Sequence, residues 1–366
     1  MLRDTLVCTV GTSLLGNLKN SENQELQKAL QSRDPAMIAR FMGKESPDVR
    51  MLGAEINSVN SILSSKRLDE RKNLYLLCSD TEDGHFIGRV LEKYFQSGPL
   101  AFKNIDRLTV QGLTDQDPQK FRTEGLRDLV RRVADIVWSV GHNRILINAT
   151  GGYKAQISFA GMIGQALDMP VCYMFEGFSE VIELPPQPIA LDFSFWLQYV
   201  DLFYELAKDE ALENPASRDP RFQSLVDIEP VNGSEIIGLS PVGQLFHESF
   251  RHRFATQRKK LLPPEYDIKP ENKDIKYEDS NSGKHTGLDK HLNRLVQRSY
   301  VKRIYTHYYN PDLPKPNSFK ASTKGGVSQI EGVYSDGKGT TKFDVVITAG
   351  SAEERDAAIA DLYEAI

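Results

Sequence analysis

The sequence has no apolar run long enough to span a bilayer, which argues against a membrane protein and predicts no membrane partner. Its first residues lack the pattern of a signal peptide, so we expect a cytoplasmic protein. It holds only three cysteines, Cys8, Cys78 and Cys172, whose spacing fits neither a disulfide framework nor a metal site. Each cysteine falls inside a predicted strand, and no histidine–cysteine cluster is present. We therefore expect reduced core thiols, no bound metal and no cofactor.

A strong excess of one charge is also missing. The formal net charge of −5, from 45 Lys and Arg against 50 Asp and Glu, gives no overall attraction to nucleic acid. Any nucleic-acid site must therefore be local. Hydrophobic residues make up 40% of the chain and charged residues 26%, as in ordinary globular proteins. The length of 366 residues suggests two or three domains.

What the sequence does contain is a strand–turn–helix unit at residues 144–163. Residues 144–147, apolar apart from Arg144, predict a buried strand, and a tightly packed helix begins at Lys154. Between them, residues 148–152 read Asn-Ala-Thr-Gly-Gly, and the glycines let the backbone approach an anion closely. The first free N–H groups of the helix and the charge of Lys154 favour the same kind of ligand. Taken alone, the turn fits a packing glycine equally well.

A matching unit lies near the N-terminus, where the predicted strand 6–10 runs into Gly-Thr-Ser-Leu-Leu at residues 11–15. Two such turns in one parallel sheet can meet at a crevice beyond the strand ends. Together the two motifs resemble the sensor domain of CRISPR-associated CARF proteins, over roughly the first half of the chain. The resemblance implies a doubly wound, Rossmann-like sensor that forms a homodimer and binds a cyclic oligoadenylate across the dimer axis.

On this resemblance the ligand contacts both turns. The expected ligand residues are Gly11, Thr12, Ser13, Leu14, Asn148, Thr150, Gly151, Gly152 and Lys154. Cyclic tetra-adenylate is the expected activator, because a two-fold ligand suits a two-fold dimer. The family sometimes degrades its activator, and Ser13 and Lys154 are the candidates for such ring nuclease activity. Glu55 and Asn57 lie on a predicted helix, residues 53–63, and either face adenine edges or form a solvated helix face; we favour the second.

Strands alternate with helices as far as residue 184, which predicts a parallel sheet covered by helices on both faces. Residues 17–54 form a polar, helical excursion, and residues 181–184 are expected to pair at the edge of the sheet. Asp80 and Thr81 precede a helix and are interpreted as N-caps. We place this CARF-like domain at residues 1–186, because Pro185 and Pro186 stop regular structure.

Residues 187–258 follow a different pattern. Predicted helices at 193–206 and 220–226, a short strand pair or wing at 234–239, and a helix capped by Ser240 with Pro241 at its first position resemble a winged-helix-like intermediate domain. The aromatic helix 193–206 carries no basic partners, so packing or dimer contact is the favoured interpretation. Residues 259–282 are polar and without periodicity, and we expect a linker or an extended arm.

The C-terminal domain, residues 283–366, is locally basic, with eleven Lys and Arg against five acids between residues 283 and 350. Its predicted order is a helix at 290–297, a strand at 300–308, a lysine-bearing loop at 311–326, a hairpin and a final helix capped by Ser351. This order resembles the RelE-type ribosome-dependent mRNA interferases, which implies a small α+β domain with a curved antiparallel sheet and a basic face.

The candidate catalytic residues follow from the chemistry of metal-free RNA cleavage. The 2′-OH is the nucleophile, so the reaction needs a proton acceptor, cations at the phosphate and an acid for the leaving oxygen. We assign Arg303 and either Lys320 or Lys324 to the phosphate, and His307 or Tyr305 to proton transfer. The alternative is that Tyr305 packs in the core and Arg303 makes a surface ion pair.

The expected function is that of a type III CRISPR ancillary effector: the ring binds the sensor dimer and activates a metal-independent ribonuclease that cuts mRNA on the ribosome. The sequence lacks the Arg and His spacing of HEPN ribonucleases and the Glu-x-Lys of restriction-type nucleases. The alternative is a cyclic-oligoadenylate-responsive transcription regulator that acts through the winged helix.

Overall fold

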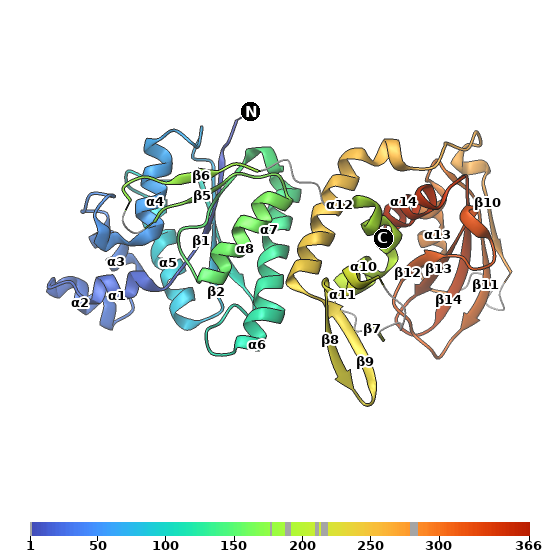
Figure 1. Cartoon of the computed structure of the whole chain (residues 1–366), viewed down its shortest axis with the longest axis horizontal. Coiled ribbons are helices and arrows are strands. Elements are labelled where there is room, and N and C mark those ends of the chain that lie inside the picture. Colours follow the sequence, from blue (N-terminus) through green and yellow to red (C-terminus); the bar gives the residue numbers. More distant parts are fainter. Residues whose placement is uncertain (1, 176–177, 187–191, 209–211, 214–218, 279–284) are drawn as a thin grey trace. The chain divides into compact units, whose positions relative to one another are not determined.

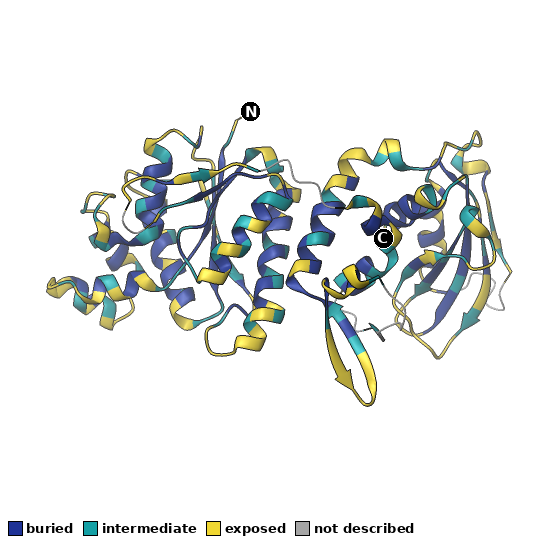
Figure 2. Cartoon of the chain, viewed as in Figure 1, coloured by how far each residue is buried: buried dark blue, intermediate teal, exposed yellow. Residues whose placement is uncertain are grey.

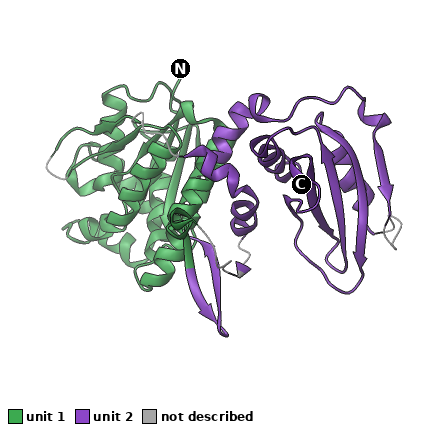
Figure 3. Cartoon of the chain, turned by 45° about the vertical axis from the view of Figure 1, so that its right-hand side comes forward, with its two compact units in different colours: residues 1–189, 218–227, 240–249 green, residues 190–217, 228–239, 250–366 purple. Residues whose placement is uncertain are grey.

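The structure, a computed structural model, describes residues 2–175, 178–186, 192–208, 212–213, 219–278 and 285–366. It divides into two compact units, shown in Figure 3. Unit 1 consists of residues 1–189, 218–227 and 240–249, and unit 2 of residues 190–217, 228–239 and 250–366. The segment predicted as an intermediate domain, residues 187–258, is thus shared between the two units. Residue 187 itself lies outside the described residues.

Unit 1 is built on a six-stranded sheet with the order β3-β2-β1-β4-β5-β6 (Figure 1). All its neighbours run parallel except β6, which pairs antiparallel with β5 at the edge. The predicted parallel sheet and its edge strand are therefore confirmed. The strands are β1 (Thr5–Thr9), β2 (Asn73–Ser79), β3 (Asn104–Val110), β4 (Ile145–Asn148), β5 (Val171–Tyr173) and β6 (Ile182–Leu184).

Helices cover both faces of this sheet, because alternate residues of the central strands enter different cores. Leu6 and Cys8 of β1 join the core on one face, whereas Val7 joins the core on the other. Helices α4 and α5 belong to the first core and α7 and α8 to the second. The helices are α1 (Ser13–Lys19), α2 (Gln24–Gln31), α3 (Pro35–Met42), α4 (Gly53–Ser64), α5 (Glu82–Gln96), α6 (Pro118–Lys120), α7 (Leu126–Val140) and α8 (Lys154–Ala166).

Local signals explain the first helices. The side chains of Asn23 and Asp34 accept hydrogen bonds from the free N–H groups of α2 and α3, and Pro35 opens α3. Thr81 caps α5 as predicted, through a 3.0 Å bond from the Gly84 N–H. The excursion between β1 and β2 is therefore helical, as its composition indicated. The three cysteines are free and buried.

The middle segment keeps the predicted order of helices, wing and helix, but residues 234–239, predicted as a strand pair, form only one strand of the wing, and its partner precedes it. The aromatic helix is two helices, α9 (Phe193–Gln198) and α10 (Val200–Ala207), interrupted at Tyr199. Trp196 is fully buried and its ring lies about 6.1 Å from those of Phe250 and Phe254, which confirms the packing interpretation. After α11 (Pro220–Gln223), strands β8 (Val226–Val231) and β9 (Ser234–Leu239) form the wing, with β7 (Leu212–Glu213) beside β9. Ser240 caps α12 (Pro241–Leu261).

Unit 2 contains a five-stranded sheet with the order β10-β11-β14-β13-β12. Its strands are β10 (Asp274–Tyr277), β11 (Val301–Asn310), β12 (Ser318–Ala321), β13 (Gln329–Ser335) and β14 (Thr340–Ile347). The sheet is antiparallel apart from β10, which runs parallel to β11. The polar segment 259–282 therefore supplies an edge strand as well as a connection. The boundary predicted at residue 282 lies outside the described residues.

Helices α13 (Leu288–Val296) and α14 (Ala352–Tyr363) pack on one face of this sheet. That face contributes Phe319 and Phe343, both fully buried, and the ring of Tyr363 meets Phe319 edge-on at 5.3 Å. Figure 2 shows α14 as largely buried, whereas the strands carry both buried and more exposed residues. The predicted loop at 311–326 differs from the structure because it contains β12. Phe319 explains this difference, since a buried aromatic side chain anchors the segment to the sheet.

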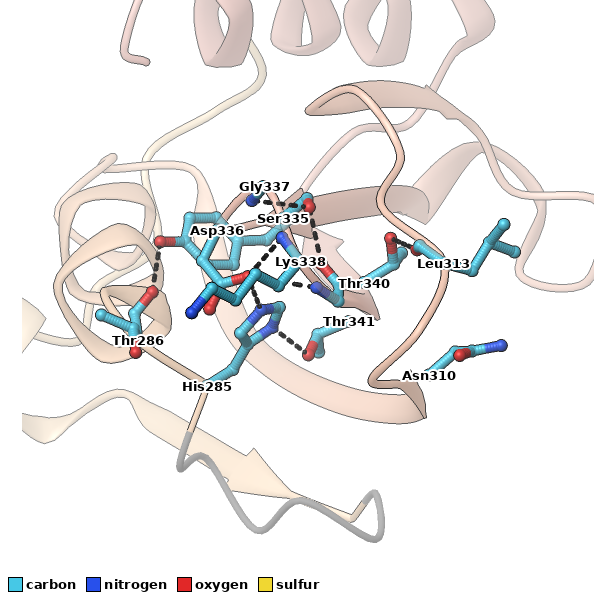
Figure 4. A network of polar contacts seen from close by, with 12 residues as sticks. His285, Thr286, Asn310, Leu313, Ser335, Asp336, Gly337, Lys338, Thr340 and Thr341 are labelled. Atoms are coloured by element: carbon cyan, nitrogen blue, oxygen red, sulfur yellow. Dashed lines mark hydrogen bonds and ion pairs between the residues drawn. The ribbon is translucent and has the colours of Figure 1, made fainter.

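A polar network ties the approach to α13 to the β13–β14 turn (Figure 4). The His285 Nε2 lies 2.8 Å from Asp336 Oδ1, and its Nδ1 lies 3.0 Å from the Thr341 hydroxyl. Asp336 also accepts the N–H groups of Lys338 and Gly339. The hydrogen bond from His285, followed by these N–H groups, lowers the pKa of Asp336 to about 2 from 3.8.

This network predicts a specific acid sensitivity. Because the pKa of Asp336 is lower in the folded state than in the unfolded state, its stabilisation is complete above about pH 4 and is lost as the pH falls toward 2. Asp336→Asn should therefore unfold with a shallower pH dependence than the wild type over that window. Urea midpoints measured at pH 5, 4, 3 and 2.5 check this. Parallel curves for the two proteins would contradict it.

Candidate functional site

The crevice of unit 1 lies where the strand order reverses. Starting from β1, the chain adds β2 and β3 on one side and β4 and β5 on the other. Strands β1 and β4 are parallel neighbours, with Cys8 opposite Asn148, so the turns that follow them emerge side by side. In doubly wound sheets this switch point is where ligands bind. The prediction that the two glycine turns meet is therefore confirmed.

The two turns approach each other so closely that only glycine fits. A Cβ on Gly11 would lie 2.7 Å from the Gly152 N atom. Gly152 has a φ of +102°, a backbone conformation that residues other than glycine rarely adopt. The Thr9 hydroxyl donates to the Gly151 carbonyl at 2.5 Å and fixes the second turn against β1. We call residues 9–13 and 148–154 the paired turns.

A buried carboxylate lies between the paired turns. Glu55, on the first turn of α4, is 1% exposed, and its Oε1 accepts the Gly11 N–H at 2.7 Å. The Glu55 Oε2 has no hydrogen-bond partner among the described residues. Burial, which outweighs the hydrogen bond from Gly11, raises the pKa of Glu55. The solvated helix face favoured from the sequence is wrong for Glu55, because the residue faces the sheet.

The predicted ligand residues differ in how far solvent reaches them: six are at least partly exposed, and three are buried. Thr12, Gly11, Thr150 and Gly152 are half-buried, and Ser13 and Lys154 are exposed at the starts of α1 and α8. By contrast, Leu14, Asn148 and Gly151 are buried.

The side chains of Leu14 and Asn148 are not available to a ligand, which corrects the prediction that these two residues contact it. Leu14 is fully buried in the core, since the first turn of α1 packs against the sheet. The Asn148 amide donates to Ser58 Oγ at 2.8 Å and accepts the Thr150 hydroxyl at 2.7 Å, so it joins β4 to α4. Asn57 is likewise structural, because its amide donates to the carbonyls of Pro47 and Val49.

A cavity of about 760 Å³ opens at the other end of the strands, the end at which they begin. It is lined by residues that precede β1, β4 and β5, among them Arg3, His142 and Asp168. The carboxylate of Glu183 there forms ion pairs with two guanidinium groups: its Oε1 lies 3.3 Å from the Arg3 Nη1, and its Oε2 lies 2.6 Å from the Arg67 Nη1. These cations are thus already paired with a carboxylate, and the cavity lies at the amino ends of the strands, away from the paired turns.

The packing of Gly151 gives a first prediction for this site. A Cβ there would lie 2.7 Å from the Glu55 Cδ and 2.8 Å from the Thr9 carbonyl oxygen. Gly151→Ala should therefore lower the free energy of unfolding by about 1–3 kcal/mol, the usual cost of overpacking. Urea denaturation of the full chain measures it.

Gly161 in α8 is the matched control, because a Cβ there meets nothing within 4 Å. Gly161→Ala should be neutral or stabilise the protein by up to about 1 kcal/mol, since alanine favours helix. Equal effects of the two substitutions would show that the paired turns are not tightly packed.

The second candidate surface is the face of the unit 2 sheet opposite α13 and α14, which we call the open face. One register row crosses it. Lys276 of β10 lies opposite Tyr305, Tyr305 opposite Asp344, Asp344 opposite Glu331, and Glu331 opposite Lys320. Directly opposite residues project from the same face, so one row brings five polar side chains from all five strands together.

Ion pairs connect this row to its neighbours. Glu331 Oε1 lies 3.1 Å from the Lys320 Nζ and 3.8 Å from the Lys342 Nζ. The His307 Nε2 lies 3.5 Å from Asp344 Oδ2, next to a β-bulge between Thr306 and Tyr308. The open face is therefore mixed in charge, and its two central carboxylates are partnered by cations or by histidine.

Two groups on the open face have shifted pKa values. Burial, followed by the charge of Asp344 and a hydrogen bond to it, raises the pKa of Tyr305, so the phenol stays protonated at neutral pH. Burial disfavours the charged form of Glu331, but the hydrogen bond and charge of Lys320 and the charge of Lys342 outweigh it and lower the pKa of Glu331. The Tyr305 hydroxyl also accepts a 2.8 Å bond from the Gln329 amide.

The structure thus brings four of the five predicted catalytic residues together. Arg303 is exposed, with its guanidinium 5.8 Å from the ring centre of Tyr305. Tyr305 is half-buried on the open face, so the alternative of a core tyrosine is wrong. Lys324 lies in the turn after β12, and its described hydrogen bond stays within that turn. Sequence reasoning missed Glu331, Asp344 and Lys342, although their alternation along the predicted hairpin placed them on one face.

Two searches of the described residues concern other kinds of site. No three His, Cys, Asp or Glu side chains come together there as metal ligands. No described helix is long and apolar enough to cross a membrane.

Comparison with known proteins gives one match to a family. Residues 50–187 match a family described as CRISPR-associated protein (Cas_APE2256), and all but the last of them lie in residues 1–186, for which the sequence predicted a sensor. No curated protein matches the chain. Among solved structures, Can2 from Sulfobacillus thermosulfidooxidans in complex with cyclic tetra-adenylate (cA4) is similar, with 12% identity over 73% of this chain and 71% of that one. The TM-score of 0.26 is too low to establish a shared fold or function.

Proposed function

We propose that this chain is a CRISPR-associated effector in which unit 1 binds a cyclic oligoadenylate, cyclic tetra-adenylate foremost, and unit 2 cleaves mRNA on the ribosome. The observation that carries the sensor half is the pair of glycine turns at the switch point, the second of which, residues 148–154, lies in the segment that matches a CRISPR-associated family. Such turns, with helix N-termini behind them, suit phosphate groups. A homodimer would supply two copies of the turns to a two-fold ring.

The open face supports the effector half. In RNA cleavage by transesterification, the 2′-oxygen attacks the phosphorus, the 2′-OH proton is removed, and the 5′-oxygen leaves with a proton. Arg303, Lys276 and Lys342 supply positive charge for the phosphate. His307, with Asp344 beside it, takes the 2′-OH proton. Tyr305, kept protonated by its raised pKa, donates to the leaving oxygen. Exposed aromatic side chains such as Tyr308 offer stacking surfaces for bases.

The wing argues against DNA binding as the main output. Strands β8 and β9 and their turn, residues 226–239, carry Asp227, Glu229 and Glu235 and no Lys or Arg. A wing that contacts DNA needs cations for the phosphates, and these carboxylates repel them. The wing therefore offers no cations for the phosphate contacts that the transcription-regulator alternative needs from it, whereas the open face has cations at its rim.

The test uses the full chain. Calorimetry with cyclic tri-, tetra- and hexa-adenylate identifies the ring that binds. Translating ribosomes with a defined mRNA are then incubated with the protein in the presence and in the absence of this ring. We expect cleavage only with the ring, leaving 2′,3′-cyclic or 3′-phosphate ends. Failure of every ring to bind would overturn the sensor proposal. Products with 3′-OH and 5′-phosphate ends would overturn the proposed chemistry.

A gel shift on the promoter of the chain's own operon, carried out with and without the ring, tests the alternative. Ring-dependent DNA binding without mRNA cleavage would favour the transcription regulator and remove the nuclease assignment.

A further inference from the structure

The Glu55 carboxylate occupies a place where a phosphate of the ligand is expected. Its Oε1 already accepts the Gly11 N–H at 2.7 Å, and a backbone amide of this kind is a donor that an anion at the paired turns would use. The side chain is also packed against Gly151, where an added Cβ would lie 2.7 Å from the Glu55 Cδ. The protein thus carries an internal anion at its own anion seat.

No cation of the described residues compensates this carboxylate. Among the described residues, Glu55 makes no ion pair, and its Oε2 is buried without a partner. The titratable groups that face it are the thiols of Cys8 on β1 and Cys78 on β2. Burial raises the pKa of both thiols, so they are neutral, and it raises the pKa of Glu55 as well. An uncompensated buried carboxylate is costly in its charged form.

A second buried group at the paired turns is also unsatisfied. Gln156, on the first turn of α8, is 0% exposed; its Oε1 accepts the Tyr153 N–H at 3.3 Å, and its Nε2 has no partner in the described part of the chain. An unpaired acceptor on α4 and an unpaired donor on α8, both packed behind the paired turns, indicate that the turns are built for a further group.

We propose that binding of the anionic ring at the paired turns is coupled to the uptake of one proton by Glu55 in each sensor unit. The reason is electrostatic: a carboxylate and a phosphate that compete for the same N–H groups in a low-dielectric crevice cannot both stay charged without a large cost. The neutral acid is a weaker acceptor for the Gly11 N–H and no longer repels the phosphate. This inference rests on the proposed function of unit 1 and names the residue that tunes ring affinity.

The coupling has a measurable sign. Because the ring-bound form holds one more proton, affinity should fall as the pH rises above the pKa of Glu55 in the free protein, by up to about tenfold per pH unit. Glu55→Gln should remove this dependence, since glutamine keeps an acceptor oxygen for the Gly11 N–H and has no charge. At pH 8 the variant should bind the ring more tightly than the wild type does.

The experiment is isothermal titration calorimetry of the full chain with cyclic tetra-adenylate, in HEPES and Tris buffers at pH 7.5 and 8. The two buffers differ in ionisation enthalpy, so the difference in observed heat counts protons taken up. We expect proton uptake by the wild type that increases with pH toward one proton per sensor unit, and none by Glu55→Gln. Glu25→Gln, an exposed carboxylate on the first turn of α2, is the control and should match the wild type.

The outcomes distinguish a wrong role for Glu55 from a wrong function for unit 1. Ring binding without proton uptake, with the same affinity in Glu55→Gln, would overturn the role of Glu55 and leave the sensor in place. Tighter binding by the wild type than by Glu55→Gln at pH 8 would also overturn it. Failure of wild type and variant alike to bind the tri-, tetra- or hexa-adenylate ring would instead overturn the proposed function.

Discussion

Replacing His307 by alanine is expected to lower the rate of ring-activated mRNA cleavage by about 10²–10⁴-fold, the usual contribution of a positioned acid or base. His307 is exposed on the open face, and its Nε2 lies 3.5 Å from Asp344 Oδ2. It is therefore accessible to RNA, and the carboxylate beside it can orient the imidazole. Because the side chain is exposed, the substitution should leave folding and ring binding unchanged. Single-turnover cleavage on ribosomes measures the effect.

Asp344 is assigned as a positioning residue, since it is 8% exposed and acts through His307 and Tyr305. Asp344→Asn keeps the shape and removes the charge. We expect a loss of about ten- to a hundredfold, matching a charge-assisted contact of about 1.5–3 kcal/mol. In the double variant with His307→Ala, the loss that Asp344→Asn adds should be smaller than in the wild type, because only the contribution of Asp344 through Tyr305 remains.

Lys290→Ala is the matched control for both variants. Lys290 is an exposed cation on α13, on the face of the sheet opposite the open face, so its loss should change neither cleavage nor stability. Full activity of His307→Ala would remove this residue from the reaction. Equal losses in Lys290→Ala and His307→Ala would indicate that general charge, and not the open face, determines the rate.

The fold of unit 1 could be predicted from the sequence because its signals are local. Apolar runs, glycine turns and capping residues such as Asn23 and Thr81 each act within a few positions, and alternating strands and helices then favour a parallel sheet. Glu55 shows the limit. Its burial depends on how α4 packs on the sheet, and a glutamate in a helix with small neighbours gives no local sign of that.

Unit 2 shows the same division between local and long-range information. The β13–β14 hairpin and the cap of α14 by Ser351 follow the predicted pattern. Strand β10 was missed, because a four-residue edge strand in a polar segment has too few residues to show a period, and its partner β11 lies beyond the end of α13. The row through Tyr305, Asp344 and Glu331 depends on register, which only the assembled sheet determines.

Asp361 is the clearest case of a residue whose importance only the structure reveals. In sequence it belongs to an acidic last helix, yet its side chain is fully buried. Its Oδ2 accepts the Tyr300 hydroxyl at 2.7 Å and lies 3.1 Å from the Arg298 Nε, and its Oδ1 pairs with Arg258. One carboxylate thus joins α12, the approach to β11 and α14.

Asp361→Ala should lower the free energy of unfolding of unit 2 by about 3 kcal/mol, since removal of one partner leaves buried polar groups and charges unpaired. The value lies at the lower end of the range for buried ion pairs because Arg258 and Arg298 are 38% and 27% exposed and can reach water. For a domain of ordinary stability this is a large share of the total. Asp361→Asn, which keeps the acceptor for Tyr300, should cost less.

The fluorescence of Trp196 provides the measurement, because this residue is fully buried and belongs to unit 2. In a Trp138→Phe background it is the sole tryptophan of the chain, so its urea transition reports on unit 2 alone. Glu353→Ala, an exposed carboxylate on the first turn of the same helix, is the control and should cost at most about 1 kcal/mol. Should Asp361→Ala cost no more than this control, the ion-pair cluster would not stabilise unit 2, and the packing of α14 would rest on its apolar side chains alone.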